Sequence, residues 1–128
     1  MKNTPGVLAV LIIDDEPELL EVARYLLARE DGVIIFTATS FSEANAVLLE
    51  HLIHFIICDY HIRSDTPEAW MMNLRLSGNE ALFLIYTGSY DVEEQHYPPV
   101  DGCLKTVLKT DIKGLQESLR MAKLYWAS

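Results

Sequence analysis

The sequence contains 128 residues, half of them apolar, which is enough for one domain whose core needs no disulfide or metal to hold it. Its formal charge is −9 and it has no basic segment that fits a phosphate backbone, so we expect no direct contact with nucleic acid. We expect a single domain over residues 1–128. The two cysteines lack disulfide or metal spacing, which indicates reduced thiols in a cytoplasmic protein. The apolar runs are far shorter than the ~18 residues of a membrane-spanning helix, so we expect no membrane contact.

The chain begins with an apolar run at 7–13, which predicts a buried strand. Pro17 follows at a position suited to the first turn of a helix, and apolar residues continue at helical spacing. We expect this helix to end near Gly32, because glycine is a common helix stop. The β-branched run at 33–36 then predicts a second strand.

The next part of the chain repeats the same alternation. Ser40 with Glu43 three residues later is a capping-box pattern, which predicts the start of a second helix. A third strand is predicted over the apolar run 53–58. A third helix is expected from Thr66-Pro67 to a stop at Gly78.

The last third of the chain is less regular at its start. A fourth strand is predicted over 81–86, and Asp91 with Glu94 could cap a fourth helix, which Pro98-Pro99 would cut short. A fifth strand is predicted over 104–108, and Asp111 is expected to cap the last helix. The apolar stripe of that helix comprises Ile112, Leu115, Leu119, Ala122 and Trp126.

Five strand-helix repeats of this kind predict a doubly wound α/β fold. Short connections between alternating strands and helices favour a parallel sheet, because right-handed crossovers place helices over both of its faces. Such sheets keep their ligand sites at the carboxyl ends of the strands.

Acidic residues follow two of the predicted strands. Asp14 and Asp15 come directly after the first strand, and Asp59 follows the third. The ends of parallel strands meet at one edge of a sheet, so these carboxylates are expected to lie close together and to repel one another unless a cation offsets their charge. A hard divalent cation such as Mg²⁺ takes oxygen ligands of this kind. An Asp-Asp pair alone is more often a helix cap or turn, so the case for a metal site depends on the residues that accompany it.

Together with Thr87 after the fourth strand and Lys109 after the fifth, the three acids resemble the signature of the response regulator receiver domain of two-component signalling. The resemblance runs nearly end to end. It implies a flavodoxin-like fold with five parallel strands in the order 2-1-3-4-5 and helices on both faces.

The resemblance also implies a role for each of these residues. Asp59 would accept a phosphoryl group on a carboxylate oxygen, and Thr87 and Lys109 would contact the phosphoryl oxygens. Mg²⁺ would be held by Asp14, Asp15, Asp59 and the backbone carbonyl of His61. A domain of this kind is no enzyme for a separate substrate, since its chemistry is Mg²⁺-dependent self-phosphorylation from a donor and autodephosphorylation.

Lys105 competes with Lys109, because Leu-Lys-Thr occurs twice, at 104–106 and at 108–110. We favour Lys109, which lies close before the predicted cap Asp111 and therefore at the carboxyl end of the strand.

The sequence departs from the family pattern at several positions. The loop after Asp59 has Arg63 and Pro67 where the family usually has proline and glycine, and Thr106 replaces an aromatic residue that takes part in switching. Thr110 replaces the usual proline after the lysine, and a cis bond before a non-proline residue costs ~3–4 kcal/mol. We therefore expect the Lys109–Thr110 peptide to be trans or visibly strained. Pro98-Pro99 is expected to alter the output surface built on the fourth helix.

These departures keep a second function open, that of a receiver-like binding module that phosphorylation does not regulate. A third hypothesis, a Mg²⁺-dependent phosphohydrolase, has weaker support, because no Asp-x-Asp pair follows a predicted strand. Under the receiver interpretation the partners are a histidine kinase or histidine phosphotransfer protein and a downstream effector. A homodimer is a further candidate, through a second face of the last helix made by Gly114, Ser118, Met121 and Tyr125.

Overall fold

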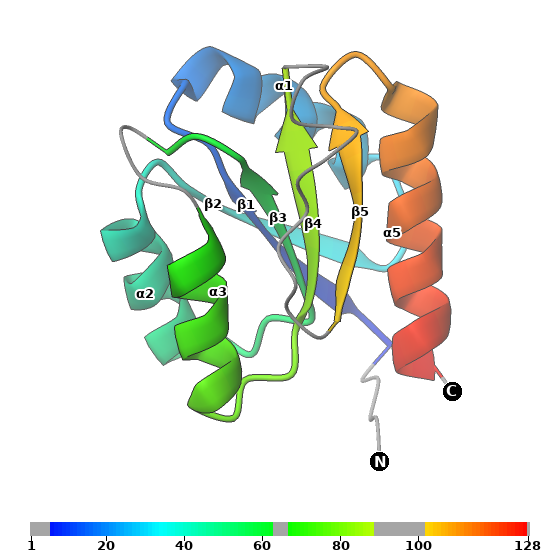
Figure 1. The fold of residues 1–128 in the computed structure, drawn as a ribbon. Helices are drawn as coiled ribbons and strands as arrows, with labels where there is room; N and C mark the ends of the chain where they lie inside the picture. The colour runs from blue at the N-terminus through cyan, green and yellow to red at the C-terminus, as the bar shows by residue number, and fades with distance from the viewer. Residues whose placement is uncertain (1–5, 63–66, 89–101, 128) are drawn as a thin grey trace.

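The computed structural model describes residues 6–62, 67–88 and 102–127, apart from the side chains of residues 105 and 106. Five parallel strands form one sheet in the order β2-β1-β3-β4-β5, which confirms the predicted doubly wound α/β fold (Figure 1). The strands are β1 (Leu8–Ile13), β2 (Val33–Ala38), β3 (Phe55–Asp59), β4 (Leu82–Thr87) and β5 (Cys103–Leu108). The helices are α1 (Pro17–Ala28), α2 (Phe41–Glu50), α3 (Pro67–Leu76) and α5 (Ile112–Ala127).

Helices cover both faces of the sheet, with α1 and α5 on one face and α2 and α3 on the other (Figure 1). The strands β1, β3 and β4 are buried along their whole length, because each lies between two neighbouring strands and two layers of helices. Alternate residues of β1 enter opposite cores: Val10 packs on the α1/α5 side and Leu11 on the α2/α3 side.

The helix starts follow the capping signals in the sequence. The Ser40 hydroxyl accepts the Glu43 N–H at 3.1 Å, and the Asp111 carboxylate accepts the Gly114 N–H at 2.9 Å, so both predicted N-caps are confirmed. Helix α1 ends at Ala28, earlier than expected. A turn between the helix and Gly32, which has a φ of 70°, accounts for the difference.

The last strand contains an irregularity near its middle. Phe83 pairs with Cys103 but Ile85 pairs with Thr106, so β5 has one residue more than β4 over this interval, as in a β-bulge. Regular pairing then resumes, with Thr87 opposite Leu108. The bulge therefore determines which residue of β5 lies beside Thr87, the last residue of β4, at the carboxyl edge of the sheet. The Lys109–Thr110 peptide is trans, as predicted.

The prediction for the two faces of α5 was only partly correct. Leu115, Leu119 and Ala122 are buried, but Ile112 at the start of the helix is exposed. Gly114 and Ser118, which we assigned to the second face, are buried instead. The Ser118 hydroxyl donates to the Gly114 carbonyl at 2.9 Å, and this internal bond lets a polar side chain lie in the core. Met121 and Tyr125 are exposed.

Three features named in the sequence lie outside the described residues: the loop position Arg63, the cap at Thr66, and the segment from Asp91 to Pro99. Within the described ranges, no helix has the length and apolar character needed to cross a bilayer.

Candidate functional site

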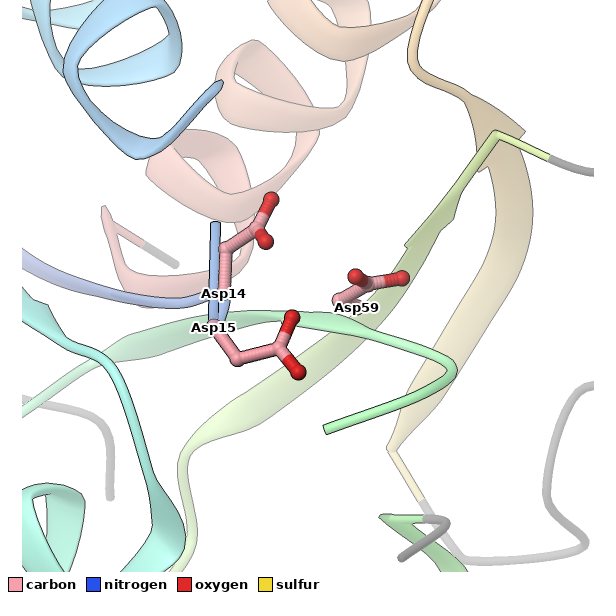
Figure 2. A group of neighbouring side chains, drawn as sticks. All are labelled: Asp14, Asp15 and Asp59. Carbon is pink, nitrogen blue, oxygen red and sulfur yellow. The ribbon is translucent and has the colours of Figure 1, made fainter. Parts of the chain in front are cut away.

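The three acids predicted to meet do lie together, at the carboxyl edge of the sheet. Asp14 and Asp15 follow β1, and Asp59 is the last residue of the neighbouring strand β3. Each of the three carboxylates contributes one oxygen atom that lies within 4.8 Å of the oxygen atoms from the other two. Figure 2 shows the three carboxyl groups beside one another. This edge of the sheet therefore holds a compact cluster of oxygen ligands.

Asp14 is fully buried, and both of its carboxylate oxygens have partners. Oδ1 accepts the Glu16 N–H at 2.9 Å, at the start of α1, and Oδ2 accepts Lys109 Nζ at 2.8 Å. Its backbone N–H donates to the carbonyl of Ala38, at the end of β2. The carboxylate is thus held by two parts of the fold and the Asp14 backbone by a third, which leaves the carboxylate little freedom to rotate.

Lys109 joins two of the acids. Its Nζ lies 2.8 Å from Asp14 Oδ2 and 3.1 Å from Asp59 Oδ2. Its backbone N–H donates to the Thr87 carbonyl at 2.7 Å, so β4 places this lysine at the site. Burial alone would lower the pKa of Lys109, but hydrogen bonds and charges from Asp14 and Asp59 outweigh burial and raise the pKa. The ammonium is therefore held in its charged form.

Asp59 is nearly buried, and burial raises the pKa of its carboxyl group above the ordinary value. Lys109 opposes this shift through its charge and hydrogen bond, whereas the charge of Asp14 adds to it. Burial dominates, so the pKa stays raised. The His61 N–H makes a long contact of 3.5 Å to Asp59 Oδ1, which keeps the loop after β3 close to the carboxylate.

A pocket of about 330 Å³ opens beside Asp59. Thr87 is the last residue of β4 and is buried in the pocket wall. The pocket is lined by Asp15, Glu16, Leu19, Asp59, His61, Thr87, Gly88 and Lys109. All the side chains proposed from the sequence, except the buried Asp14 behind Lys109, thus reach one opening large enough for a small charged group.

Sequence reasoning missed four residues of this site, of which Leu19 and Gly88 only line the pocket. Glu16 lines the pocket, and the Tyr86 ring lies beneath Lys109 with the ammonium 5.3 Å from the ring centroid. This distance is within the range of a cation–π contact. Glu16 and Tyr86 directly adjoin residues that were proposed, Asp15 and Thr87, and that adjacency was the one signal available for them. The side chain of the competing Lys105 lies outside the part of the chain described, whereas Lys109 reaches both acids.

No model of a known protein family matches this sequence, and no curated protein matches it either.

Solved structures do share the fold. A response regulator receiver domain protein from Clostridium thermocellum superposes with a TM-score of 0.77 at 22% identity, over 91% of this chain and 94% of that one. The chemotaxis response regulator CheY4 of Vibrio cholerae gives 0.76 at 19% identity, over 91% and 98%. A beryllofluoride-activated NtrC4 receiver domain, described as a dimer, gives 0.74 at 18% identity, over 92% and 98%. The chain has the fold of response regulator receiver domains.

Proposed function

We propose that residues 1–128 form a single receiver domain that takes a phosphoryl group from a phosphohistidine protein onto Asp59. The observation that carries this proposal is the placement of Lys109, which bridges Asp14 and Asp59 at the mouth of a pocket that also contains Thr87. A cap or turn would account for two adjacent acids. It would not account for a third acid from another strand and a lysine from a third part of the chain.

The donor set fits Mg²⁺. Asp15 and Asp59 line the pocket, Asp14 belongs to the same group of carboxylates, and His61 lies in the loop that directly follows Asp59 and also lines the pocket. These are hard oxygen ligands, and nitrogen or sulfur ligands are not needed. When bound, Mg²⁺ would supply positive charge to the phosphoryl oxygens and so lower the cost of bringing a carboxylate to phosphorus.

Three residues of the chain would have separate roles in the transfer. A carboxylate oxygen of Asp59 forms a bond to phosphorus while the bond from phosphorus to the donor's imidazole nitrogen breaks, and that nitrogen keeps the electron pair. Lys109 stays charged and offers its ammonium to a phosphoryl oxygen. The Thr87 hydroxyl donates a hydrogen bond to another. The net change is transfer of one phosphoryl group, and it needs no oxidant or reductant.

Phosphorylation would also change the partners of Lys109 and Thr87. At rest Lys109 is shared between Asp14 and Asp59. A new dianionic group on Asp59 competes for its ammonium and draws the Thr87 hydroxyl, a local charge change of the kind that biases two-state elements. Thr87 pairs with β5, so the effect would reach β5 and α5. Thr106 in place of the family's aromatic residue means that a different side chain must relay it.

The direct test is the intact mass of the protein after incubation with Mg²⁺ and acetyl phosphate. The wild type is expected to gain one phosphoryl group and Asp59→Asn none. Asp31→Asn, an exposed acid at the opposite edge of the sheet, is the matched control and should label like the wild type. An unlabelled wild type under conditions where Mg²⁺ measurably binds would contradict the proposal. It would favour a receiver-like binding module that phosphorylation does not regulate.

The proposed partners follow from this chemistry. A histidine kinase or histidine phosphotransfer protein would supply the phosphoryl group, and an effector would read the phosphorylated form. A second copy of the chain is a further candidate, since Met121 and Tyr125 leave an exposed apolar strip on α5. Sedimentation with and without beryllofluoride tests for this homodimer. A dimer that Met121→Glu abolishes would support the proposed interface, and a monomer in both conditions would contradict it.

A further inference from the structure

Tyr86 lies beside the acid cluster, one position before Thr87 on β4. It is the Cα partner of Asp59 on the neighbouring strand β3. Successive residues of a strand point to opposite faces of a sheet, and Phe55 and Ile57 on β3 pack in the same core as Tyr86. Asp59 and Tyr86 therefore point to the same face of the sheet, the face that α1 and α5 cover.

The Tyr86 ring has little freedom to move. Tyr86 is 4% exposed and packs in the core between the sheet and helices α1 and α5. Burial raises the pKa of Tyr86, and the positive charge of Lys109 opposes this rise without cancelling it, so the phenol is neutral at physiological pH. A fixed and uncharged aromatic ring thus forms one wall of the ion cluster.

The ammonium of Lys109 lies over this ring. Its Nζ is 5.3 Å from the ring centroid of Tyr86. The same atom is 2.8 Å from Asp14 Oδ2 and 3.1 Å from Asp59 Oδ2. The negative face of a ring attracts a cation at this distance, and the attraction strengthens when water is excluded. Because the Lys109 side chain is only 12% exposed, the ring is a third significant contact of the ammonium, beside the two carboxylates.

An aromatic ring differs from a carboxylate in a way that matters for phosphoryl transfer. A carboxylate attracts the lysine but repels an incoming phosphoryl group, because both are negative. The neutral ring attracts the ammonium without this repulsion. When the Asp59 carboxylate bonds to phosphorus it loses its own negative charge, so it can no longer hold Lys109 as an ion pair. The contact between the ring and the ammonium does not depend on that charge.

We propose that Tyr86 is a positioning residue, whose ring face holds the Lys109 ammonium at the pocket while Asp59 gains a phosphoryl group. Its role in the transfer rests on the proposed function, whereas the coupling between ring and ammonium can be measured in the unphosphorylated protein. A residue that only fills the core would contribute its volume and not the electrons of its ring. Fluorine separates these two roles, because it withdraws electrons from a ring and changes its shape little.

The experiment compares Tyr86→Phe with the same chain carrying trifluorophenylalanine at residue 86. Urea denaturation at pH 7.5 without Mg²⁺ gives the unfolding equilibrium constant of each, with Lys109 present and again with Lys109→Met. Fluorination should raise this constant by roughly fivefold more when Lys109 is present, since only then does a cation face the ring. The comparison of the two backgrounds cancels the effect of fluorine on hydrophobicity and packing.

Phe83 supplies the matched control. It lies on the same strand, is fully buried, and faces a different cation on the other side of the sheet, with Arg75 Cζ 4.7 Å from the ring centroid. Trifluorophenylalanine at residue 83 should change stability to the same extent with Lys109 and with Lys109→Met. Equal effects of fluorination at residue 86 in the two backgrounds would overturn the proposal. A coupling to Lys109 that is as large from residue 83 would overturn it too.

Hydrogen exchange of the Lys109 ammonium, followed by NMR, decides the matter if Lys109→Met does not fold. Exchange should be equally slow in the wild type and Tyr86→Phe, and roughly fivefold faster with trifluorophenylalanine at residue 86. The difference should persist when Mg²⁺ and beryllofluoride, a stand-in for the phosphoryl group, are added. Equal exchange in all three proteins, fast exchange already in Tyr86→Phe, or a difference that disappears with beryllofluoride would each overturn the proposal.

The outcomes also separate this proposal from the proposed function. If acetyl phosphate labels the wild type but fluorination at residue 86 shows no coupling to Lys109, the role of Tyr86 fails alone. If the coupling is present but the wild type is not labelled, the proposed function fails, and Tyr86 is then a structural partner of Lys109 with no part in phosphoryl transfer.

Discussion

Lys109 is the residue on which the acid cluster most depends. It is the cation described in contact with Asp14 and Asp59, and both acids are almost completely buried. Removing one member of a buried ion pair is far more costly than the pair is worth, because the remaining charge loses both solvent and partner. The lysine therefore stabilises the fold and also holds the carboxylates of Asp14 and Asp59 in place.

Lys109→Met should lower the free energy of unfolding by about 3 kcal/mol at pH 7.5 without Mg²⁺. Urea denaturation measures this, with Lys113→Met, a change at an exposed lysine of α5, as the control. The loss should shrink when Mg²⁺ is added, because a divalent cation can offset the same carboxylates. Equal effects of the two substitutions would contradict the assignment of Lys109.

Asp59→Asn should stabilise the metal-free protein at pH 7.5. The pKa of Asp59 is raised in the folded state, so the folded protein retains a proton to higher pH than the unfolded chain does. The charged carboxylate therefore costs stability at neutral pH, and this cost disappears as the pH falls through the raised pKa. The gap between the two unfolding curves should close toward pH 4. An Asp59→Asn protein less stable than the wild type at pH 7.5 would show that Lys109 outweighs burial.

At the scale of helices and strands, local signals in the sequence predicted most of the structure. Ser40 and Asp111 start helices through side-chain bonds to the backbone three residues ahead, which depend on sequence alone. The β5 bulge and the burial of Ser118 could not be predicted in this way. They depend on pairing with β4 and on an internal bond to Gly114, which are properties of the packed molecule.

The same distinction applies to the site. The three acids were predicted to meet because each follows a strand, and strand ends in a parallel sheet share an edge. The choice of Lys109 over Lys105 depended on the position of a helix cap. Tyr86 was missed because a ring beneath a lysine has no signature in the sequence.

The cap of α2 gives an element-scale prediction. Ser40→Ala removes the acceptor for the Glu43 N–H and should cost about 1 kcal/mol of unfolding free energy. Ser42→Ala, at an exposed position in the same turn, should change stability little. Thermal or urea unfolding of the two variants is the measurement, and equal losses would mean that the Ser40 bond contributes nothing. Glu43 also accepts the Thr39 N–H at 2.6 Å, so part of the cap should survive.

At the scale of the whole molecule, metal binding should couple to folding. A ligand bound only by the folded state stabilises it by about 2.7 kcal/mol at one hundred times its Kd. Mg²⁺ should therefore raise the urea midpoint of the wild type and leave that of Asp15→Asn nearly unchanged. Asp15→Asn should fold as well as the wild type without metal, because it relieves repulsion among the acids. A metal-free Asp15→Asn protein that is markedly less stable would assign Asp15 a structural role instead.

The contact between Lys109 and the acids also bears on the charge of the ion that the proposed metal site would prefer. Three carboxylates and one ammonium leave two negative charges unbalanced. A monovalent ion would leave one of them, and a trivalent ion would overshoot, whereas a divalent ion brings the group to electroneutrality. At the proposed metal site the lysine would therefore favour divalent over monovalent cations by charge balance, so Na⁺ and K⁺ at cellular concentrations should compete poorly for the position.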